Sequence, residues 1–306
     1  MKQKIINIEQ SEYWNEKSGP KWVKFDDAMN ERFSILTKKL FLKANIKKSD
    51  HVLDIGCGGG ETTYQTSKLL DNTGHVVGAD ISNTLLEHAK SKFSNINKIE
   101  FINCDVQNYK FKKNYFNKVI SRFGVMFFEN PFDAFQNIHS SMKTNGSLHF
   151  VCWTDLMKNE FFIEGMEIIT KYTQEDLPEI TKQPGPFAFN DEEYIKEILE
   201  FSGFKNINVD KVYTSISTKD SVRDNANILL GIGPRAKILS EKNLSSEKLL
   251  IVKNEMVELC KKRRVNDVTN YKACINYVSA IKWLNNLINS NQMNSQNYVS
   301  VNNVYF

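Results

Sequence analysis

Paired cysteines and long apolar runs are missing from this chain of 306 residues. Its five cysteines include no Cys-x-x-Cys pair and are odd in number, which argues against a disulfide framework or a zinc site and favours a reducing compartment. No uninterrupted apolar run approaches the roughly 18 residues of a membrane span. The first residues also lack the apolar core of a signal peptide. We therefore expect a soluble cytoplasmic protein with no membrane span and no bound metal.

A strong charge bias is lacking as well. The formal net charge is +4, and the 40 lysines and arginines are spread along the chain. The densest cluster, Lys261–Arg264, is interpreted as a solvated helix end. A nucleic-acid-binding face needs clustered positive charge, so we expect no nucleic-acid partner. No feature of the sequence specifies an oligomeric state.

Strand-like and helix-like segments alternate strictly in the first half of the chain. Apolar patterns predict strands at residues 51–56, 75–80, 98–105, 116–123 and 147–153. Amphipathic patterns predict the intervening helices at residues 61–70, 82–93 and 130–143, with Ser82 as a cap and Pro131 in a first turn. This alternation is the pattern of a parallel sheet covered on both faces.

Helical patterns dominate elsewhere. Helices are predicted at residues 28–44, 159–173, 191–203, 221–230 and 247–261. A loop with three prolines separates the second and third of them. Residues 204–217 read as one strand or a hairpin, and residues 275–283 as a strand or a helix.

The stretch VLDIGCGGGETT, residues 52–63, joins the first strand to the first helix of the alternating region. Glycines at such a junction let the backbone turn sharply and let a ligand approach the free N–H groups of the helix. The alternative is a tight turn without a ligand. The pattern is G-x-G-x-G, and Glu61 stands where a dinucleotide fingerprint has its third glycine. A carboxylate there would repel a pyrophosphate, which disfavours NAD and FAD.

Three acids follow successive strands. Asp54, Asp80 and Asp105 stand at the carboxyl ends of the first, second and third strands, where ligands bind in doubly wound folds. Asp80 is placed to accept hydrogen bonds from ribose hydroxyls, and Asp105 to accept one from an exocyclic amine. Asp54 beside the glycines suits a ligand with ammonium or sulfonium charge. The pattern therefore indicates a nucleoside carrying positive charge and little phosphate, which points to S-adenosylmethionine.

The segments VLDIGCGGGETT, VVGADIS, INCDVQ and SRFGVMFFENPFDAFQNIHSSMKTNGSLHFVCW resemble the successive motifs of class I S-adenosylmethionine-dependent methyltransferases. The resemblance is strongest to small-molecule methyltransferases of the ubiquinone-biosynthesis type, and it covers roughly residues 14 to 209. It implies a doubly wound, Rossmann-like α/β fold with a seven-stranded, mostly parallel sheet and one antiparallel strand, with helices on both faces. Residues 275–283 are our candidate for the antiparallel strand.

The resemblance also implies a division of the chain. We expect an N-terminal helical lid at residues 1–45 and a methyltransferase domain at residues 46–285, with helical insertions after residues 155 and 218. A polar, frayed tail is expected at residues 286–306.

The family's cofactor roles carry over to matching positions in this sequence. Gly56, Gly58 and Gly60 would line the methionine part of the cofactor, with Asp54 nearby. Asp80 would bind the ribose hydroxyls. Ile81 would pack on the adenine, and Asp105 with Val106 would hold its edge. The residues that would flank the methyl donor are Ser121 and Arg122.

Methyl transfer needs a dry pocket that holds donor and acceptor in line. Candidate aromatic walls are Phe123 and Phe127 after the fourth strand, Phe187 in the proline-containing loop, and the N-terminal Tyr13, Trp14 and Trp22. None of the five histidines stands convincingly at the carboxyl end of a strand, so no general base is identified. Arg122 could orient a substrate or bind the cofactor carboxylate.

We conclude from the sequence that the chain is a methyltransferase acting on an O, N or C atom of a small organic acceptor. Two alternatives stay open: a nicotinamide-dependent oxidoreductase on a similar sheet, and a protein that binds S-adenosylmethionine without turnover. The absence of an Asn-Pro-Pro-Tyr-type motif after the fourth strand disfavours nucleic-acid methylation.

Overall fold

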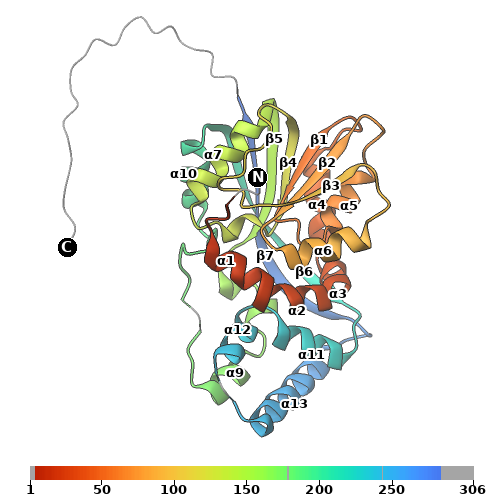
Figure 1. Cartoon of the computed structure of the whole chain (residues 1–306). Helices are drawn as coiled ribbons and strands as arrows, with labels where there is room; N and C mark the ends of the chain where they lie inside the picture. The colour runs from red at the N-terminus through yellow and green to blue at the C-terminus, as the bar shows by residue number, and fades with distance from the viewer. Residues whose placement is uncertain (1–3, 178, 243, 284–306) are drawn as a thin grey trace, which may run out of the picture.

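A single seven-stranded sheet organises the computed structural model, which describes residues 4–177, 179–242 and 244–283. The strand order is β3-β2-β1-β4-β5-β7-β6 (Figure 1). The strands are β1 (His51–Ile55), β2 (His75–Asp80), β3 (Ile99–Asn103), β4 (Phe116–Arg122), β5 (Met142–Trp153), β6 (Phe204–Thr218) and β7 (Thr269–Lys282). Strand β7 runs antiparallel to its neighbours β5 and β6, whereas the other pairs are parallel. The predicted fold class is confirmed, including the antiparallel strand.

The helices surround this sheet and extend beyond one end of it. They are α1 (Ile8–Glu12), η1 (Tyr13–Lys17), α2 (Gly19–Lys24), α3 (Asp26–Arg32), α4 (Ser34–Ala44), α5 (Glu61–Ser67), α6 (Asn83–Lys92), η2 (Val125–Phe127), α7 (Pro131–Ser141), η3 (Leu156–Lys158), α8 (Glu160–Ile163), α9 (Met166–Thr173), α10 (Glu192–Phe201), α11 (Val222–Gly231), α12 (Pro234–Glu241) and α13 (Ser246–Arg263).

Local chemistry explains where two core helices begin. The Ser82 hydroxyl accepts a hydrogen bond from the backbone N–H of Leu85 at 3.1 Å, as the predicted cap of α6 requires. Helix α7 begins with Pro131 in its first turn, and the Asn130 side chain caps it. Both helices therefore begin where the sequence places them.

Two predicted helices are each broken in the structure. The helix expected over residues 28–44 is divided at Phe33 into α3 and α4. The helix expected over residues 159–173 is divided into α8 and α9, because Gly165 adopts a left-handed conformation with φ of +73°. The sequence left open whether residues 204–217 form one strand or a hairpin. They lie in the single strand β6.

Two helical groups lie beyond the sheet. Helices α1, α2 and α3 cross its lower end in Figure 1, and α9, α11, α12 and α13 pack on one another below them. We call this second group the helical cap. Within the described part of the chain, no helix combines the length and apolarity needed to cross a bilayer. The predicted tail at residues 286–306 lies outside the described residues.

Candidate cofactor and acceptor cavity

A cavity of about 740 Å³ lies between the sheet, the N-terminal helices and the helical cap. The carboxyl ends of β1, β2, β4 and β5 open into it. The predicted site residues that line it are Trp14, Trp22, Gly56, Gly58, Asp80, Ile81, Asp105, Val106, Arg122, Phe123, Phe127 and Phe187. Three others do not line it: Asp54, Gly60 and Ser121. The topology thus brings residues from distant parts of the sequence to one space.

Three of the four glycines in the loop after β1, Gly56, Gly58 and Gly60, have positive φ, but they serve different purposes. A Cβ on Gly58 would meet no atom within 4 Å, so the backbone is open there. A Cβ on Gly56 would lie 2.5 Å from the Cα of Gly124, so this glycine permits close approach of the loop after β4. A Cβ on Gly60 would lie 2.8 Å from the ring of Phe101. Gly60 therefore serves packing beneath the loop, contrary to its expected place in the cavity lining.

Asp54 and Ser121 lie one layer behind the cavity. The Asp54 carboxylate is fully buried and accepts hydrogen bonds from the hydroxyls of Thr62 and Thr63 at 2.6 and 2.7 Å. Burial raises the pKa of Asp54 to about 6. The Ser121 hydroxyl donates to the carbonyl of Ile55 at 2.7 Å and so joins β4 to β1. Both side chains point into the sheet's packing, which is why neither faces the cavity.

Asp80 is nearly buried at the end of β2 and lines the cavity. Its two oxygens accept hydrogen bonds from the backbone N–H groups of Gly58 and Ser82, each at 2.8 Å. Burial raises the pKa of Asp80, although these hydrogen bonds oppose the shift. The carboxylate is thus held rigidly beside the glycine loop, with lone pairs left for a ligand.

Asp105 has partners that the sequence did not predict. Its Oδ2 accepts hydrogen bonds from the backbone N–H groups of Ile6 and Asn7 at 3.1 and 2.8 Å. Its Oδ1 accepts one from the backbone of Gln107 at 3.0 Å. The side chain of Asn7 donates in turn to the carbonyl of Phe127 at 3.0 Å. The first described residues of the chain therefore form one edge of the cavity.

Arg122 ends β4, and its guanidinium is directed at the N-terminal helices. It donates to Thr37 Oγ1 at 2.9 Å and to Asn30 Oδ1 at 2.5 Å. Asn30 donates to Asp26, which also accepts a hydrogen bond from Lys92 at 2.7 Å. Burial lowers the pKa of Arg122 while nearby carboxylates oppose the shift. Its main visible role is to hold the N-terminal helices against the core.

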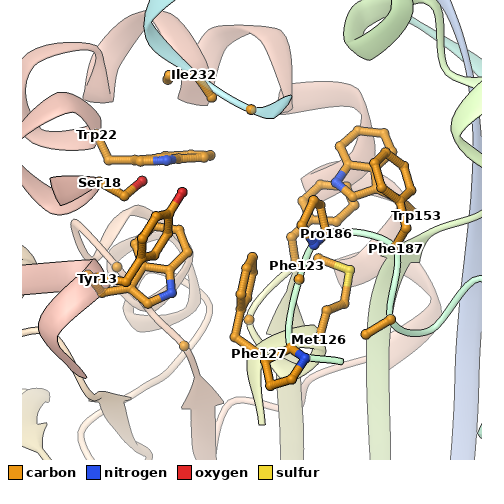
Figure 2. Close-up of a pocket in the computed structure, with 18 of the residues that line it drawn as sticks. Tyr13, Ser18, Trp22, Phe123, Met126, Phe127, Trp153, Pro186, Phe187 and Ile232 are labelled. Atoms are coloured by element: carbon orange, nitrogen blue, oxygen red, sulfur yellow. The ribbon is translucent and has the colours of Figure 1, made fainter. Parts of the chain in front are cut away.

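Aromatic rings form the other half of the cavity (Figure 2). Trp22 and Tyr13 face it from the N-terminal helices, and Trp153 and Phe187 face it from the opposite side. Many lining residues were not predicted from the sequence, among them Phe33, Trp153, Phe162 and Ile232. Trp153 could have been found, because it ends β5 as Asp80 ends β2. The other three lie in or between helices, and no local sequence pattern indicates that these helices pack against the cavity.

The cavity fits S-adenosylmethionine on two observations of the structure. The open space at Gly58 admits a ligand against the backbone. The Oδ1 of Asp54 is buried with no hydrogen-bond partner among the described residues, so a cationic group near the loop would stabilise it. No group of three or more histidine, cysteine or acidic residues in the described chain could hold a metal ion.

Comparison with known sequences finds similarity to methyltransferases over the same region. A family model described as a methyltransferase domain matches residues 52–146. The chain is 25% identical over 189 residues to the demethylmenaquinone methyltransferase of Staphylococcus saprophyticus, covering 58% of this chain and 80% of that protein. It is also 25% identical over 203 residues to the ubiquinone/menaquinone biosynthesis C-methyltransferase UbiE of Francisella philomiragia, covering 59% and 79%.

Solved structures share the fold. The YcgJ protein of Bacillus subtilis aligns with a TM-score of 0.52 at 14% identity, covering 83% of this chain and 98% of that one. Phosphoethanolamine N-methyltransferase 2 of Haemonchus contortus aligns with a TM-score of 0.50 at 19% identity, covering 81% of this chain. The matched region spans about half (52%) of that enzyme. These comparisons confirm the resemblance stated from the sequence, and none of them supports the nicotinamide-dependent alternative.

Proposed function

This chain is an S-adenosylmethionine-dependent methyltransferase, and we propose that its acceptor is a small apolar molecule held between the N-terminal helices and the helical cap. One observation carries the proposal. A single cavity joins the glycine loop and Asp80 at one end to the aromatic walls at the other. Donor and acceptor can therefore lie in contact within one enclosure, as in-line transfer to an O, N or C atom requires.

At the cofactor end, Asp80 would accept hydrogen bonds from the ribose hydroxyls, since its oxygens keep free lone pairs beside the loop. Ile81 and Val106 would pack against the adenine, and the Oδ1 of Asp105 would accept a hydrogen bond from its amine. The open backbone at Gly58 would admit the methionine part. Asp54 would act from behind the loop, through its charge.

At the acceptor end, the aromatic rings would hold a flat apolar body and exclude water. The relatives named above take their names from quinone biosynthesis, and quinone rings are bodies of this shape. Arg122 would act by holding Asn30 and Thr37 in place at the edge of the cavity. We assign no general base.

The proposed division of the chain follows from the same arrangement. Residues 1–45 would form a lid, because Asn7, Trp14 and Trp22 all line the cavity. The insertions after residues 155 and 218 would supply the helical cap. The five cysteines are unbonded and buried, which supports a reducing compartment such as the cytoplasm.

Thermal unfolding with ligands tests the proposal. A ligand that binds only the folded state raises the melting temperature by mass action, by about 2.7 kcal/mol of stability at a hundredfold excess over Kd. We expect shifts with S-adenosylmethionine and S-adenosylhomocysteine and none with NADH. A shift with NADH alone would contradict the assignment of the glycine loop.

A further inference from the structure

Aromatic rings surround the acceptor half of the cavity on opposite sides. Trp14 meets Phe127 edge to face at 4.9 Å between ring centroids, and Trp22 lies 6.1 Å from Trp14. Across the cavity, Phe123 stacks on Trp153 at 4.2 Å (Figure 2). Ring faces carry negative electrostatic potential, so they attract cations and apolar groups and offer nothing to an anion.

Carboxylates line the outer part of the cavity. Asp176, Glu179 and Glu241 are exposed there, on the loop after α9 and at the end of α12. The cationic residues that line the described cavity are Arg122 and Lys237, and the Arg122 guanidinium already has two partners. A phosphate or carboxylate on the acceptor would meet net repulsion at this mouth, whereas an ammonium group would be attracted.

The inner carboxylates are already engaged. Asp26 accepts hydrogen bonds from Asn30 and Lys92, and Glu61 accepts one from Gln65 at 2.8 Å. Asp80 and Asp105 accept backbone N–H groups, as described above. No histidine lines the described cavity. An O–H or C–H acceptor would need a base beside the reacting atom to remove its proton during attack. The inner carboxylates already accept hydrogen bonds, and Asp176, Glu179 and Glu241 lie in the exposed outer part of the cavity.

The Tyr13 hydroxyl is a polar group on the aromatic wall that could bind an N–H group of the acceptor. It points into the space below Trp22 in Figure 2 and lines the cavity. Among the described residues, no hydrogen bond to the Tyr13 hydroxyl is found. A hydroxyl in this position can accept a hydrogen bond from an N–H group of a bound molecule.

We propose that the methyl acceptor is an amine on an apolar body, oriented by the Tyr13 hydroxyl; this rests on the methyltransferase function proposed above. The acceptor enters as an ammonium ion and loses one proton to water, a loss that the apolar walls favour by desolvation. The nitrogen lone pair then forms the N–C bond while the C–S bond breaks and its electron pair goes to sulfur. Positive charge moves from sulfur to nitrogen, and the product leaves as a methylated ammonium ion.

This step conserves charge inside the aromatic walls. The rings that stabilise the sulfonium also stabilise the ammonium that replaces it. Transfer to a phenolate or carbanion would instead neutralise the sulfonium charge, so the product would lose the attraction of the rings and carboxylates for a cation. The charge distribution therefore favours nitrogen over oxygen and carbon nucleophiles.

A matched acceptor panel tests the inference with the full-length protein. The four compounds share a naphthalene ring and differ in the group that it carries. They are 1-naphthylmethylamine, 1-naphthol, 1,4-naphthohydroquinone and 1-naphthoic acid. Methyl transfer from S-adenosylmethionine is followed by mass spectrometry, and S-adenosylhomocysteine binding is measured by calorimetry in parallel. We expect kcat/KM for the amine to exceed that for each of the others by at least about tenfold, the equivalent of one good hydrogen bond. The rate with the amine should rise with pH up to the pKa of the bound amine.

Two variants sharpen the test. Tyr13→Phe should lower kcat/KM for the amine about tenfold and leave cofactor affinity unchanged, while Tyr213→Phe, on the exposed edge strand β6, should change neither.

The triple variant D176N/E179Q/E241Q should raise KM for the amine about threefold, and high salt should abolish the difference. The triple variant E87Q/E193Q/E258Q makes the same change of net charge on exposed residues that do not line the cavity, and should leave KM unchanged.

The outcomes distinguish failure of the amine proposal from failure of the proposed cofactor site. Preferred methylation of naphthol or the hydroquinone would overturn the amine inference and leave the methyltransferase function intact. So would methylation of none of the four by a protein that binds S-adenosylhomocysteine. Failure to bind S-adenosylhomocysteine at all would instead overturn the proposed cofactor site. Unchanged kinetics in Tyr13→Phe would overturn the role of that hydroxyl.

Discussion

Phe123 and Trp153 stack face to face at the centre of the cavity wall, with ring centroids 4.2 Å apart and planes 3° apart. Phe123 directly follows β4, and Trp153 is the last residue of the neighbouring parallel strand β5; Arg122 pairs in register with Val151. Phe123 has a positive φ of 66°, which is uncommon for any residue with a side chain. The strained backbone places its ring against Trp153, so the fold accepts a local cost to build this wall.

Removal of Trp153 should be costly. The ring is 3% exposed, and Trp153→Ala should lower the free energy of unfolding by about 3–5 kcal/mol through lost burial and a cavity. Urea denaturation measures this loss. Trp283→Ala provides the matched control, because Trp283 is 54% exposed and should change stability by no more than about 0.5 kcal/mol. Equal losses in the two variants would contradict the packing described here.

Loss of the Asp80 carboxylate should weaken cofactor binding. Asp80→Ala removes the proposed ribose acceptor and should cost about 1–3 kcal/mol of binding free energy for S-adenosylmethionine, measured by titration calorimetry. Asp71→Ala is the control, since Asp71 is an exposed turn residue that does not line the cavity. Unchanged affinity in Asp80→Ala would show that the ribose lies elsewhere.

A side chain at Gly58 should interfere with both backbone and ligand. Gly58→Ala places a Cβ at φ of +55°, which should cost about 1–2 kcal/mol of stability. The new methyl group would project into open space beside the loop, and we expect cofactor affinity to fall on the order of tenfold. Gly185→Ala is the comparison, because Gly185 also lines the cavity and its Cβ would meet only ordinary contacts. If the two variants bind the cofactor equally well, the loop does not approach the ligand.

Stability should depend on pH through Asp54. Burial raises its pKa from 3.8 to about 6 in the folded state. The folded protein then binds more protons than the unfolded chain between these values, so the free energy of unfolding falls as pH rises from about 4 to 6. The loss through this group should reach about 2–3 kcal/mol and stay constant at higher pH.

The variant Asp54→Asn isolates this contribution, because an amide can still accept hydrogen bonds from Thr62 and Thr63 and does not titrate. Urea denaturation of both proteins across pH 4–7 should give similar stabilities near pH 4 and a more stable variant at pH 7. Parallel pH profiles for the two proteins would show that Asp54 titrates normally.

Local patterns in the sequence determined the core of the fold and the sheet edge at which we propose that the cofactor binds. The apolar segments specify the strands through burial, and the Ser82 cap and Pro131 specify where two helices begin through local chemistry. The structure confirms them. Asp80 and Asp105 could be placed on one edge because parallel strands present their carboxyl ends together. Placing these two residues requires only the direction of the chain and the knowledge that the strands are parallel.

Only the tertiary structure decided which face each side chain presents and what covers the cavity. Asp54, Gly60 and Ser121 belong to the predicted motifs, yet packing against Thr62, Phe101 and Ile55 turns them away from the cavity. The backbone of Asn7 reaches Asp105 across 98 residues of sequence. Phe162 and Ile232 reach the wall from the segments that follow β5 and β6. Such contacts join segments whose separation along the chain leaves no periodic signal, so they emerge only when the whole core is packed.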